Sequence, residues 1–293
     1  MNKKDTITLS NIGLVLEGGG MRGLYTSGVL DYFLEKNIEF PYVIGVSAGA
    51  IMSASYISGQ KGRNLETQLR FINDKRYMGI SHLLKNGSYF NYDFSYKEIP
   101  DKLVPFDFDK FFSSKIDYRI GLFDCNTGKS RFIPKSEIKD KERLMKVLQA
   151  SGSLPFISKI VHIDDEEYLD GGLKSQIPLN ESINDGNKKN VVVLTREKGY
   201  LKTAPKFQSF TKLYYRNYPE VVKILKNRYQ IYNDNLKVIE DLEEKGEIFV
   251  IRPRNKVLCD RLEKNPAKLT KLYFDALRDM DYYYDDLMTW LTK

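Results

Sequence analysis

Two glycine-rich turns, each between a short apolar run and a helical pattern, constrain the fold of this chain most strongly. Residues 12–17 (Ile-Gly-Leu-Val-Leu-Glu) have the length and composition of a buried strand, and a glycine run at 18–23 follows them. Residues 42–46 form a second such strand, which leads into the turn Gly45-Val46-Ser47-Ala48-Gly49 and a small-residue helix. This repeated order of strand, turn and helix predicts an α/β fold with a mostly parallel central sheet and helices on both faces.

The rest of the chain continues the alternation. Segment 59–115 is irregular and aromatic-rich, and we expect helices and loops that cover a site. Further strands are predicted at 116–123, 130–133, 190–196 and 248–251, and further helices at 141–150, 219–245 and 266–293. We therefore predict an α/β domain over residues 8–255 and a helical C-terminal extension over 256–293 packed on it.

Charge and hydropathy narrow the classes of partner. The net charge is +7, and an excess of Lys and Arg, interleaved with aromatic residues, falls between residues 196 and 237. This mixture suits either an anionic membrane surface or a solvated basic face. Nucleic acid is not expected, because no helix-turn-helix, repeated or aromatic-lined signature accompanies the basic residues. No apolar run approaches the roughly 20 residues of a membrane span and no secretory signal is evident. We thus expect a cytoplasmic protein, with peripheral membrane contact and signal-independent export left open.

Cysteine and histidine are scarce. Cys125 and Cys259 give neither a disulfide framework nor paired metal spacing, and His82 and His162 are too isolated for a zinc site. We therefore predict no metal site, and two reduced thiols that pack as small apolar residues.

Ser47 is the first candidate for chemistry. A sharp turn from strand to helix exposes a serine, and the glycines at positions 45 and 49 let the backbone turn without a side-chain clash. A serine hydroxyl also needs an adjacent base and donors that stabilise the oxyanion formed during acyl transfer.

The glycine run Gly18-Gly19-Gly20-Met21-Arg22-Gly23 has two interpretations. Its amides can form an oxyanion hole beside Ser47, with Arg22 adding positive potential. Alternatively, Gly18-x-Gly20-x-x-Gly23 fits the dinucleotide-binding template. That template expects an acidic residue near the end of the next strand, whereas Glu39 precedes this strand and Ser47 follows it. The oxyanion hole is therefore favoured, and no cofactor is predicted.

The base predicted for Ser47 is a carboxylate. Hydrolase triads of the strand-turn-helix type place a histidine after the acid, but no histidine follows His162. Asp170 is the best candidate, because Asp170-Gly171-Gly172 follows a short strand and the glycines allow close approach to another segment. An aspartate that merely caps a turn at a strand end is the structural alternative.

Taken together, the glycine run, the Gly45–Gly49 turn and Asp170-Gly171-Gly172 resemble the patatin-like phospholipases, and more specifically bacterial members. The resemblance implies a Ser–Asp dyad, with Ser47 as nucleophile and Asp170 as base. It also implies an oxyanion hole from the amides around Gly19, Gly20 and Met21. The small-residue segment 150–155 is similar to the one that precedes Asp-Gly-Gly in that family.

The implied function is a lipid acyl hydrolase of phospholipase A or carboxylesterase type, acting on lipid or ester substrates without metal or cofactor. Because aspartate in water is a weak base, with a pKa near 4, we expect a dry site that raises the pKa of Asp170. The alternative is a catalytically silent, basic membrane-surface protein on the same fold. The sequence predicts no particular oligomeric state.

Overall fold

A single large sheet organises the molecule. The computed structural model describes residues 7–8, 11–204 and 209–293. Within them, eight strands form a sheet of order β10-β9-β2-β4-β5-β8-β7, with β6 paired to β5. Their bounds are β2 (Ile12–Leu16), β4 (Tyr42–Val46), β5 (Asp117–Asp124), β6 (Ser130–Pro134), β7 (Val161–Ile163), β8 (Glu166–Asp170), β9 (Lys189–Val193) and β10 (Ile248–Ile251). Two short strands, β1 (Ile7–Thr8) and β3 (Ile38–Glu39), pair separately.

The sheet has a parallel and an antiparallel part. From β10 to β5 all pairs are parallel, and Leu14 of β2 lies between Val43 of β4 and Val191 of β9. Every residue of β2 and β4 is buried, as expected for parallel strands covered on both faces. β5 pairs antiparallel with β6 and β8, and β7 pairs antiparallel with β8. The predicted mostly parallel sheet is confirmed, with an antiparallel edge.

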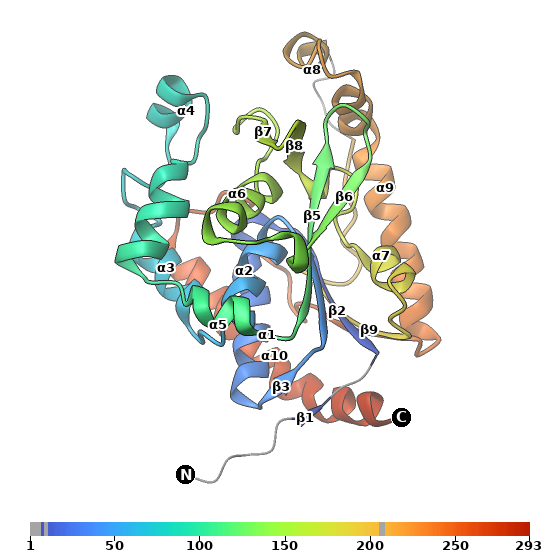
Figure 1. Ribbon diagram of the computed structural model, residues 1–293. Helices are drawn as coiled ribbons and strands as arrows, with labels where there is room; N and C mark the ends of the chain where they lie inside the picture. The colour runs from blue at the N-terminus through green and yellow to red at the C-terminus, as the bar shows by residue number, and fades with distance from the viewer. Residues whose placement is uncertain (1–6, 9–10, 205–208) are drawn as a thin grey trace.

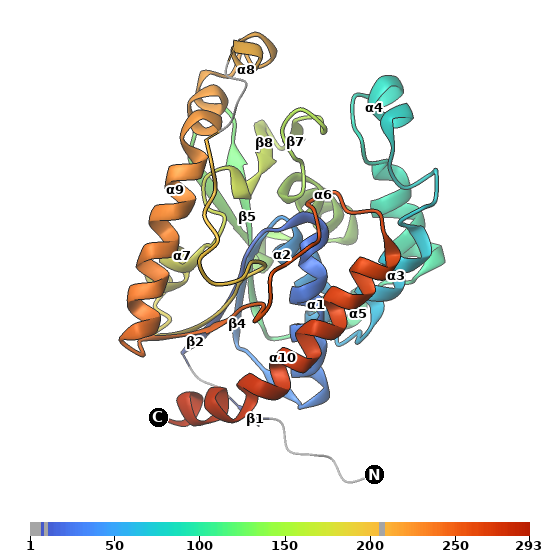
Figure 2. The same cartoon turned by 180° about the vertical axis from the view of Figure 1, so that it is seen from behind.

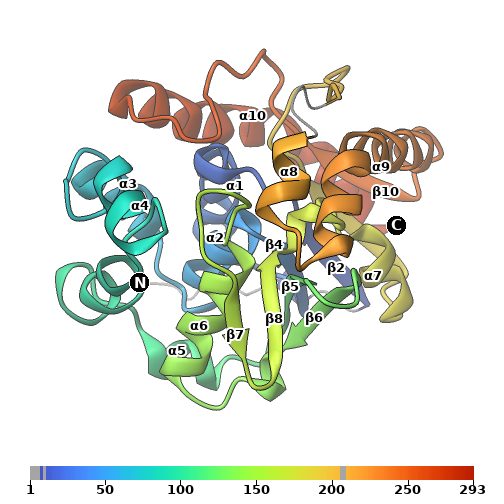
Figure 3. The ribbon, with the colours of Figure 1, turned by 90° about the horizontal axis from the view of Figure 1, so that it is seen from above.

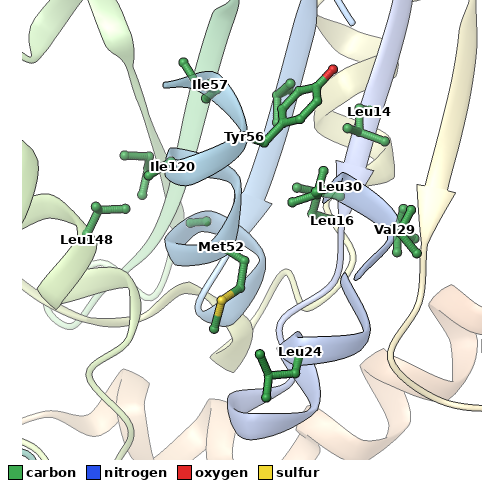
Figure 4. Packing of buried hydrophobic residues seen from close by; sticks show 14 of the residues in the cluster. Leu14, Leu16, Leu24, Val29, Leu30, Met52, Tyr56, Ile57, Ile120 and Leu148 are labelled. Atoms are coloured by element: carbon green, nitrogen blue, oxygen red, sulfur yellow. The ribbon is translucent and has the colours of Figure 1, made fainter. Parts of the chain in front are cut away.

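One face of the sheet is covered by α1 (Gly23–Glu35), α2 (Ala48–Ile57), α6 (Lys141–Ser151) and α10 (Pro266–Thr292). Leu14 and Leu16 point to this face, where they join Leu30 of α1 and Met52 of α2 in the main core (Figure 4). Because side chains alternate along a strand, Val15 points to the opposite face.

The opposite face is covered by α7 (Leu179–Asn184) and the long α9 (Pro219–Glu244). Tyr232, Leu236 and Ile239 of α9 pack there against Val15 and Val192. Figure 3 shows α1 and α2 on one side of the sheet and α7 and α9 on the other. The predicted placement of helices on both faces is therefore confirmed.

The C-terminal helix α10 packs directly on α1 (Figure 2). The hydroxyl of Tyr25 donates a hydrogen bond to Asp279 (3.0 Å), and that of Tyr273 donates to Asp31 (2.8 Å). A Cβ on Gly28 would lie only 2.6 Å from the carbonyl oxygen of Tyr273, so the two helices approach closely here. The helical C-terminal region is confirmed, and a domain boundary at residue 255 stays a prediction.

Segment 59–115 consists of helices and loops, as predicted. It contains α3 (Arg63–Phe71), α4 (Ile80–Asn86), the π-helix η2 (Phe94–Leu103) and α5 (Phe108–Ser113). Pro100 lies inside η2, where its missing N–H disturbs the regular α-helical bonding. The short α8 (Ser209–Tyr214) precedes α9. In the part of the chain that the structure describes, no helix combines the length and apolar character needed to cross a membrane.

Candidate active site

Ser47 occupies the tight turn between β4 and α2. Its φ of 54° and ψ of −126° lie in a region that residues other than glycine rarely adopt. A Cβ on Gly49 would lie 2.6 Å from the carbonyl oxygen of Leu16, and one on Gly45 would lie 2.7 Å from the nitrogen of Ala50. Only glycine fits at both positions, so the sharp strand-to-helix turn expected from the sequence is present.

The structure brings Ser47 and Asp170 together. Ser47 Oγ donates a hydrogen bond of 2.6 Å to Asp170 Oδ2, and both residues are buried, with 7% and 3% of their surface exposed. Asp170 ends β8, and its other oxygen, Oδ1, accepts the N–H of Gly172 at 2.7 Å. Gly171 and Gly172 form the short 3-10 helix η4 (Gly171–Leu173). The two carboxylate oxygens thus have separate partners, and Oδ2 faces the serine.

Burial raises the pKa of Asp170 above its ordinary value. The hydrogen bonds from Ser47 and Gly172 and the positive charges of Arg228 and Arg261 oppose this shift, but they are smaller than the cost of desolvating the charge. The direction agrees with the dry site expected from the sequence. A carboxylate with a raised pKa accepts a proton from a serine more readily than one in water.

The two histidines lie elsewhere. His82 is half-buried and His162 is exposed; His82 Nε2 lies 2.8 Å from the carbonyl oxygen of Lys75, and His162 Nδ1 lies 3.7 Å from Glu167. Neither lines the cavity at Ser47. Asp170, and neither histidine, is therefore the side chain that accepts a hydrogen bond from Ser47 Oγ.

The glycine loop has amides of two kinds. Those of Gly18, Met21 and Arg22 donate to the carbonyl oxygens of Gln176, Arg261 and Gly19, at 3.1, 3.0 and 3.3 Å. The amides of Gly19 and Gly20 have no acceptor among the described residues. Gly20 has a positive φ of 59° and starts the 3-10 helix η1 (Gly20–Arg22), and the amide of Gly23 donates to its carbonyl. Of the predicted loop donors, Gly19 and Gly20 are therefore the two whose N–H groups are free for a ligand.

Ser151 is a site residue that sequence reasoning did not single out. Its Oγ accepts the N–H of Ser47 (2.8 Å) and donates to the carbonyl oxygen of Gly121 (2.8 Å). Because Ser151 is fully buried, this bridge fixes the turn of Ser47 to β5. The signal in the sequence was the small-residue segment 150–155, which pointed to the position without its role.

An apolar cavity of about 150 Å³ opens beside Ser47. Ile51 and Met52 of α2, Phe90, Phe106 and Leu148 form much of its wall, and Gly20 and Arg261 border it near the serine. Segment 59–115 supplies many of the lining residues, from α3, η2 and the connections between them. This agrees with the predicted cover of the site and gives room for an apolar chain next to Ser47.

Arg22 is buried behind the glycine loop. It is only 6% exposed, and its Nε has no hydrogen-bond partner among the described residues. Burial and the charge of Arg196 lower the pKa of Arg22, whereas Glu17 raises it. Glu17 itself is held by the amide of Thr195 (2.6 Å) and the hydroxyl of Tyr232 (2.9 Å).

Comparisons with known proteins place this geometry in context. The uncharacterized protein YjjU of Escherichia coli (strain K12) is 26% identical, over 83% of this chain and 68% of the relative. The probable lipid hydrolase 463L of Invertebrate iridescent virus 6 is 27% identical, over 60% of this chain and 65% of the relative. An uncharacterized NTE family protein of Mycobacterium bovis, Mb2594, is 26% identical over 58% of this chain but 28% of its own length. The chain thus spans about two thirds of the first two relatives.

Among solved structures, VipD from Legionella pneumophila is similar over 96% of this chain and 66% of its own, with 12% identity and a TM-score of 0.44. Residues 218–292 match a domain of unknown function (DUF6363). Residues 14–183, which include both glycine motifs, Ser47 and Asp170, match the family model described as patatin-like phospholipase. This match covers more than half of the sequence, and the chain belongs to the patatin-like phospholipase family.

Proposed function

We propose that this chain is a lipid acyl hydrolase of phospholipase A or carboxylesterase type, with Ser47 as nucleophile and Asp170 as base. The proposal depends above all on the 2.6 Å hydrogen bond from Ser47 Oγ to Asp170 Oδ2 beside two unpaired loop amides. The apolar cavity at Ser47 suits an acyl chain. Family membership and the relative described as a probable lipid hydrolase support the same class of reaction.

The first half-reaction forms an acyl-enzyme. Asp170 Oδ2 takes the proton of Ser47 Oγ while that oxygen attacks the acyl carbonyl carbon. The oxyanion of the tetrahedral intermediate accepts hydrogen bonds from the amides of Gly19 and Gly20. The intermediate then collapses, the ester C–O bond breaks, and Asp170 gives the proton to the leaving alcohol.

The second half-reaction regenerates the serine. Asp170 takes a proton from a water molecule, which attacks the acyl carbon and forms a second oxyanion in the same place. When this intermediate collapses, Ser47 Oγ leaves and recovers the proton from Asp170, and the fatty acid is released. The carboxylate thus begins and ends each half-reaction ionised, and every proton is handled by the dyad.

Labelling and turnover together test this proposal. We expect a fluorophosphonate to label the wild-type protein, and short- and long-chain esters to be hydrolysed. Ser47→Ala should abolish labelling, and Asp170→Asn should suppress hydrolysis. Two exposed positions give matched controls, Ser81→Ala and Asp234→Asn, which should behave as wild type. Labelling that persists in Ser47→Ala, or hydrolysis unchanged in Asp170→Asn, would refute the dyad.

The same experiment distinguishes the alternative of a silent membrane-surface protein. That alternative expects binding to anionic vesicles with neither labelling nor hydrolysis in the wild type. The strained turn at Ser47 favours the enzyme, because a backbone conformation of this kind persists chiefly where a function depends on it.

We also propose peripheral membrane contact through α4 and α8, which project from the same end of the molecule (Figure 1). Ile80 and Leu84 of α4 are 69% and 81% exposed, and Phe210 and Leu213 of α8 are 57% and 69% exposed. Exposed apolar side chains gathered on one end are typical of an interfacial surface. Lys85 and Lys212 on the same helices add positive charge suited to anionic lipid.

Vesicle flotation tests this contact. We expect more protein to float with vesicles that contain anionic lipid than with neutral ones, and less at high salt. Leu84→Ser combined with Leu213→Ser should reduce flotation. Ile183→Ser on α7, 45% exposed and away from α4 and α8, is the matched control. Flotation that is indifferent to lipid charge and salt and to the double substitution would refute the proposed surface.

A further inference from the structure

Five basic side chains gather around the glycine loop, and we call them the basic cluster: Arg22, Arg196, Lys202, Arg228 and Arg261. They are close enough for their charges to repel one another. Arg196 and Arg261 lower the pKa of Arg22, Arg228 and Arg261 lower that of Lys202, and Arg261 lowers that of Arg228. The cluster also reaches the dyad, because Arg228 and Arg261 both act on Asp170.

Direct contacts fix the cluster at the site. Arg228 Nη2 donates to the carbonyl oxygen of Gly172 (3.1 Å), next to the Asp170 turn. The carbonyl oxygen of Arg261 accepts the N–H of Met21, and Arg261 lines the same cavity as Ser47. Lys202 Nζ lies 3.5 Å above the ring of Tyr232, whose hydroxyl bonds Glu17. Arg261 is therefore the member of the cluster that lines the cavity, and Arg228 connects the cluster to the turn after Asp170.

The positive charge of the cluster is not compensated. Among the described residues, none of the five side chains forms a salt bridge. Glu17 acts on Arg22 and Lys202, and Asp170 acts on Arg228. These three cations thus face two carboxylates, and they also feel the positive charges of Arg196 and Arg261.

This arrangement is costly without a ligand. Burial and the neighbouring arginines lower the pKa of Lys202 to about 6, and burial and Arg261 lower the pKa of Arg228 to about 10. The Nε atoms of Arg22 and Arg196 are buried and find no hydrogen-bond acceptor among the residues that the structure describes. Buried cations and unpaired donors destabilise a fold unless an anion meets them. Lys202, Arg228 and Arg261 are only partly buried, so an anion can reach them.

We propose that Lys202, Arg228 and Arg261, with Arg22, bind the phosphate of a phosphomonoester head group, so that acyl esters of glycerol phosphate are the preferred substrates. This inference rests on the proposed function and adds its head group. A phosphomonoester carries a charge between −1.5 and −2 near neutral pH, and its three free oxygens match the forked donors of arginine. A phosphodiester offers one charge, and a neutral glyceride none. Lys202, Arg228 and Arg261 lie outside the stretch 14–183 that matches the family model, whereas Arg22 lies inside it.

Head-group preference tests the proposal directly. Phosphatidic acid, phosphatidylcholine and diacylglycerol with identical acyl chains are presented in the same neutral detergent micelles, and kcat/KM is measured for each. We expect wild type to prefer phosphatidic acid. Lys202→Gln and Arg261→Gln should each lower the ratio of phosphatidic acid to diacylglycerol kcat/KM about 10- to 100-fold, the effect of losing one charge-assisted hydrogen bond. Arg261→Lys, which keeps the charge, should lose less.

Lys226→Gln is the matched control, because Lys226 is an exposed lysine of the same helix as Arg228 and should leave the ratio within about twofold. Inorganic phosphate supplies a second readout. It should inhibit hydrolysis of the uncharged ester p-nitrophenyl butyrate competitively, and more weakly in Lys202→Gln and Arg261→Gln.

Several results would overturn the assignment. Equal preference for phosphatidic acid and phosphatidylcholine would exclude a phosphomonoester head group. Phosphate inhibition without preference for phosphatidic acid would assign the cluster to free phosphate. Ratios unchanged in the cluster variants would exclude it from head-group binding. Failure of the proposed function looks different, since no ester is then hydrolysed and no fluorophosphonate label appears.

Discussion

The backbone strain at Ser47 can be measured by comparing Ser47→Gly with Ser47→Ala. Both substitutions remove the hydroxyl and its hydrogen bond to Asp170, so the difference in stability between them does not contain the loss of that bond. The φ of 54° and ψ of −126° cost a residue with a Cβ about 1–3 kcal/mol, which glycine does not incur. The greater conformational freedom of glycine in the unfolded chain lowers the free energy of unfolding of Ser47→Gly by about 0.4–1 kcal/mol. With the middle values of both ranges, we therefore expect Ser47→Gly to be more stable than Ser47→Ala by about 1.3 kcal/mol.

Urea unfolding and thermal melts of both inactive variants measure this difference. In the thermal melts, each kcal/mol of added stability raises Tm by about 2–4 °C. In urea, the two variants can be compared directly when their m-values agree. Lys237, exposed in the interior of α9, is the control position. There Lys237→Gly should be less stable than Lys237→Ala by about 1 kcal/mol, the opposite sign. If Ser47→Ala is as stable as Ser47→Gly, the turn is not strained and the reasoning fails.

Three further predictions concern Asp170, Ser151 and Gly28. Burial raises the folded-state pKa of Asp170 above its unfolded value, so its ionisation destabilises the fold as pH rises through the folded pKa. Asp170→Asn should thus have a higher Tm than wild type at pH 7, and this difference should vanish below the pKa that Asp170 has in the unfolded chain. The same substitution should lower kcat about 10²- to 10⁴-fold. A Tm lower than that of wild type at pH 7 would contradict the reasoning. Ser151→Ala leaves the amide of Ser47 buried without its acceptor and removes a donor from the carbonyl of Gly121, and urea unfolding should show a loss of about 1–3 kcal/mol. Gly28→Val forces α1 from α10, and we expect a lower Tm equivalent to about 1–3 kcal/mol; an unchanged Tm would mean that the helices do not meet there.

Local patterns predicted most of the elements. The apolar runs at residues 12–17 and 42–46 became β2 and β4, and the helix expected at 219–245 is α9, from Pro219 to Glu244. Strong periodicity and clear end signals explain this agreement, because both depend on neighbouring residues. The π-helix η2 was not predicted, since its bonding pattern depends on how segment 59–115 wraps the cavity.

Contacts between residues far apart in the sequence could not be predicted from local patterns. Nothing near β5 in the sequence indicates that β8 pairs with it antiparallel, although this pairing sets Asp170 opposite Leu122. The basic residues between 196 and 237 were interpreted as a membrane or solvent face. Arg228, on α9, instead bonds the carbonyl of Gly172 beside Asp170, and Lys202 lies near enough to Arg22 of the glycine loop for their charges to interact. Lys206 and Phe207 of the same stretch fall outside the described residues.

The hydrogen bond between the Met21 amide and the Arg261 carbonyl has a consequence for how the nascent chain folds during synthesis on the ribosome. The ribosome adds the residues of the glycine loop long before it adds Arg261, whose carbonyl accepts the amide of Met21. A nascent chain that ends before residue 261 lacks this restraint on the loop. We therefore expect ribosome-bound chains arrested at residue 255 to resist fluorophosphonate, and chains arrested far enough beyond residue 261 for Arg261 to leave the ribosome to be labelled.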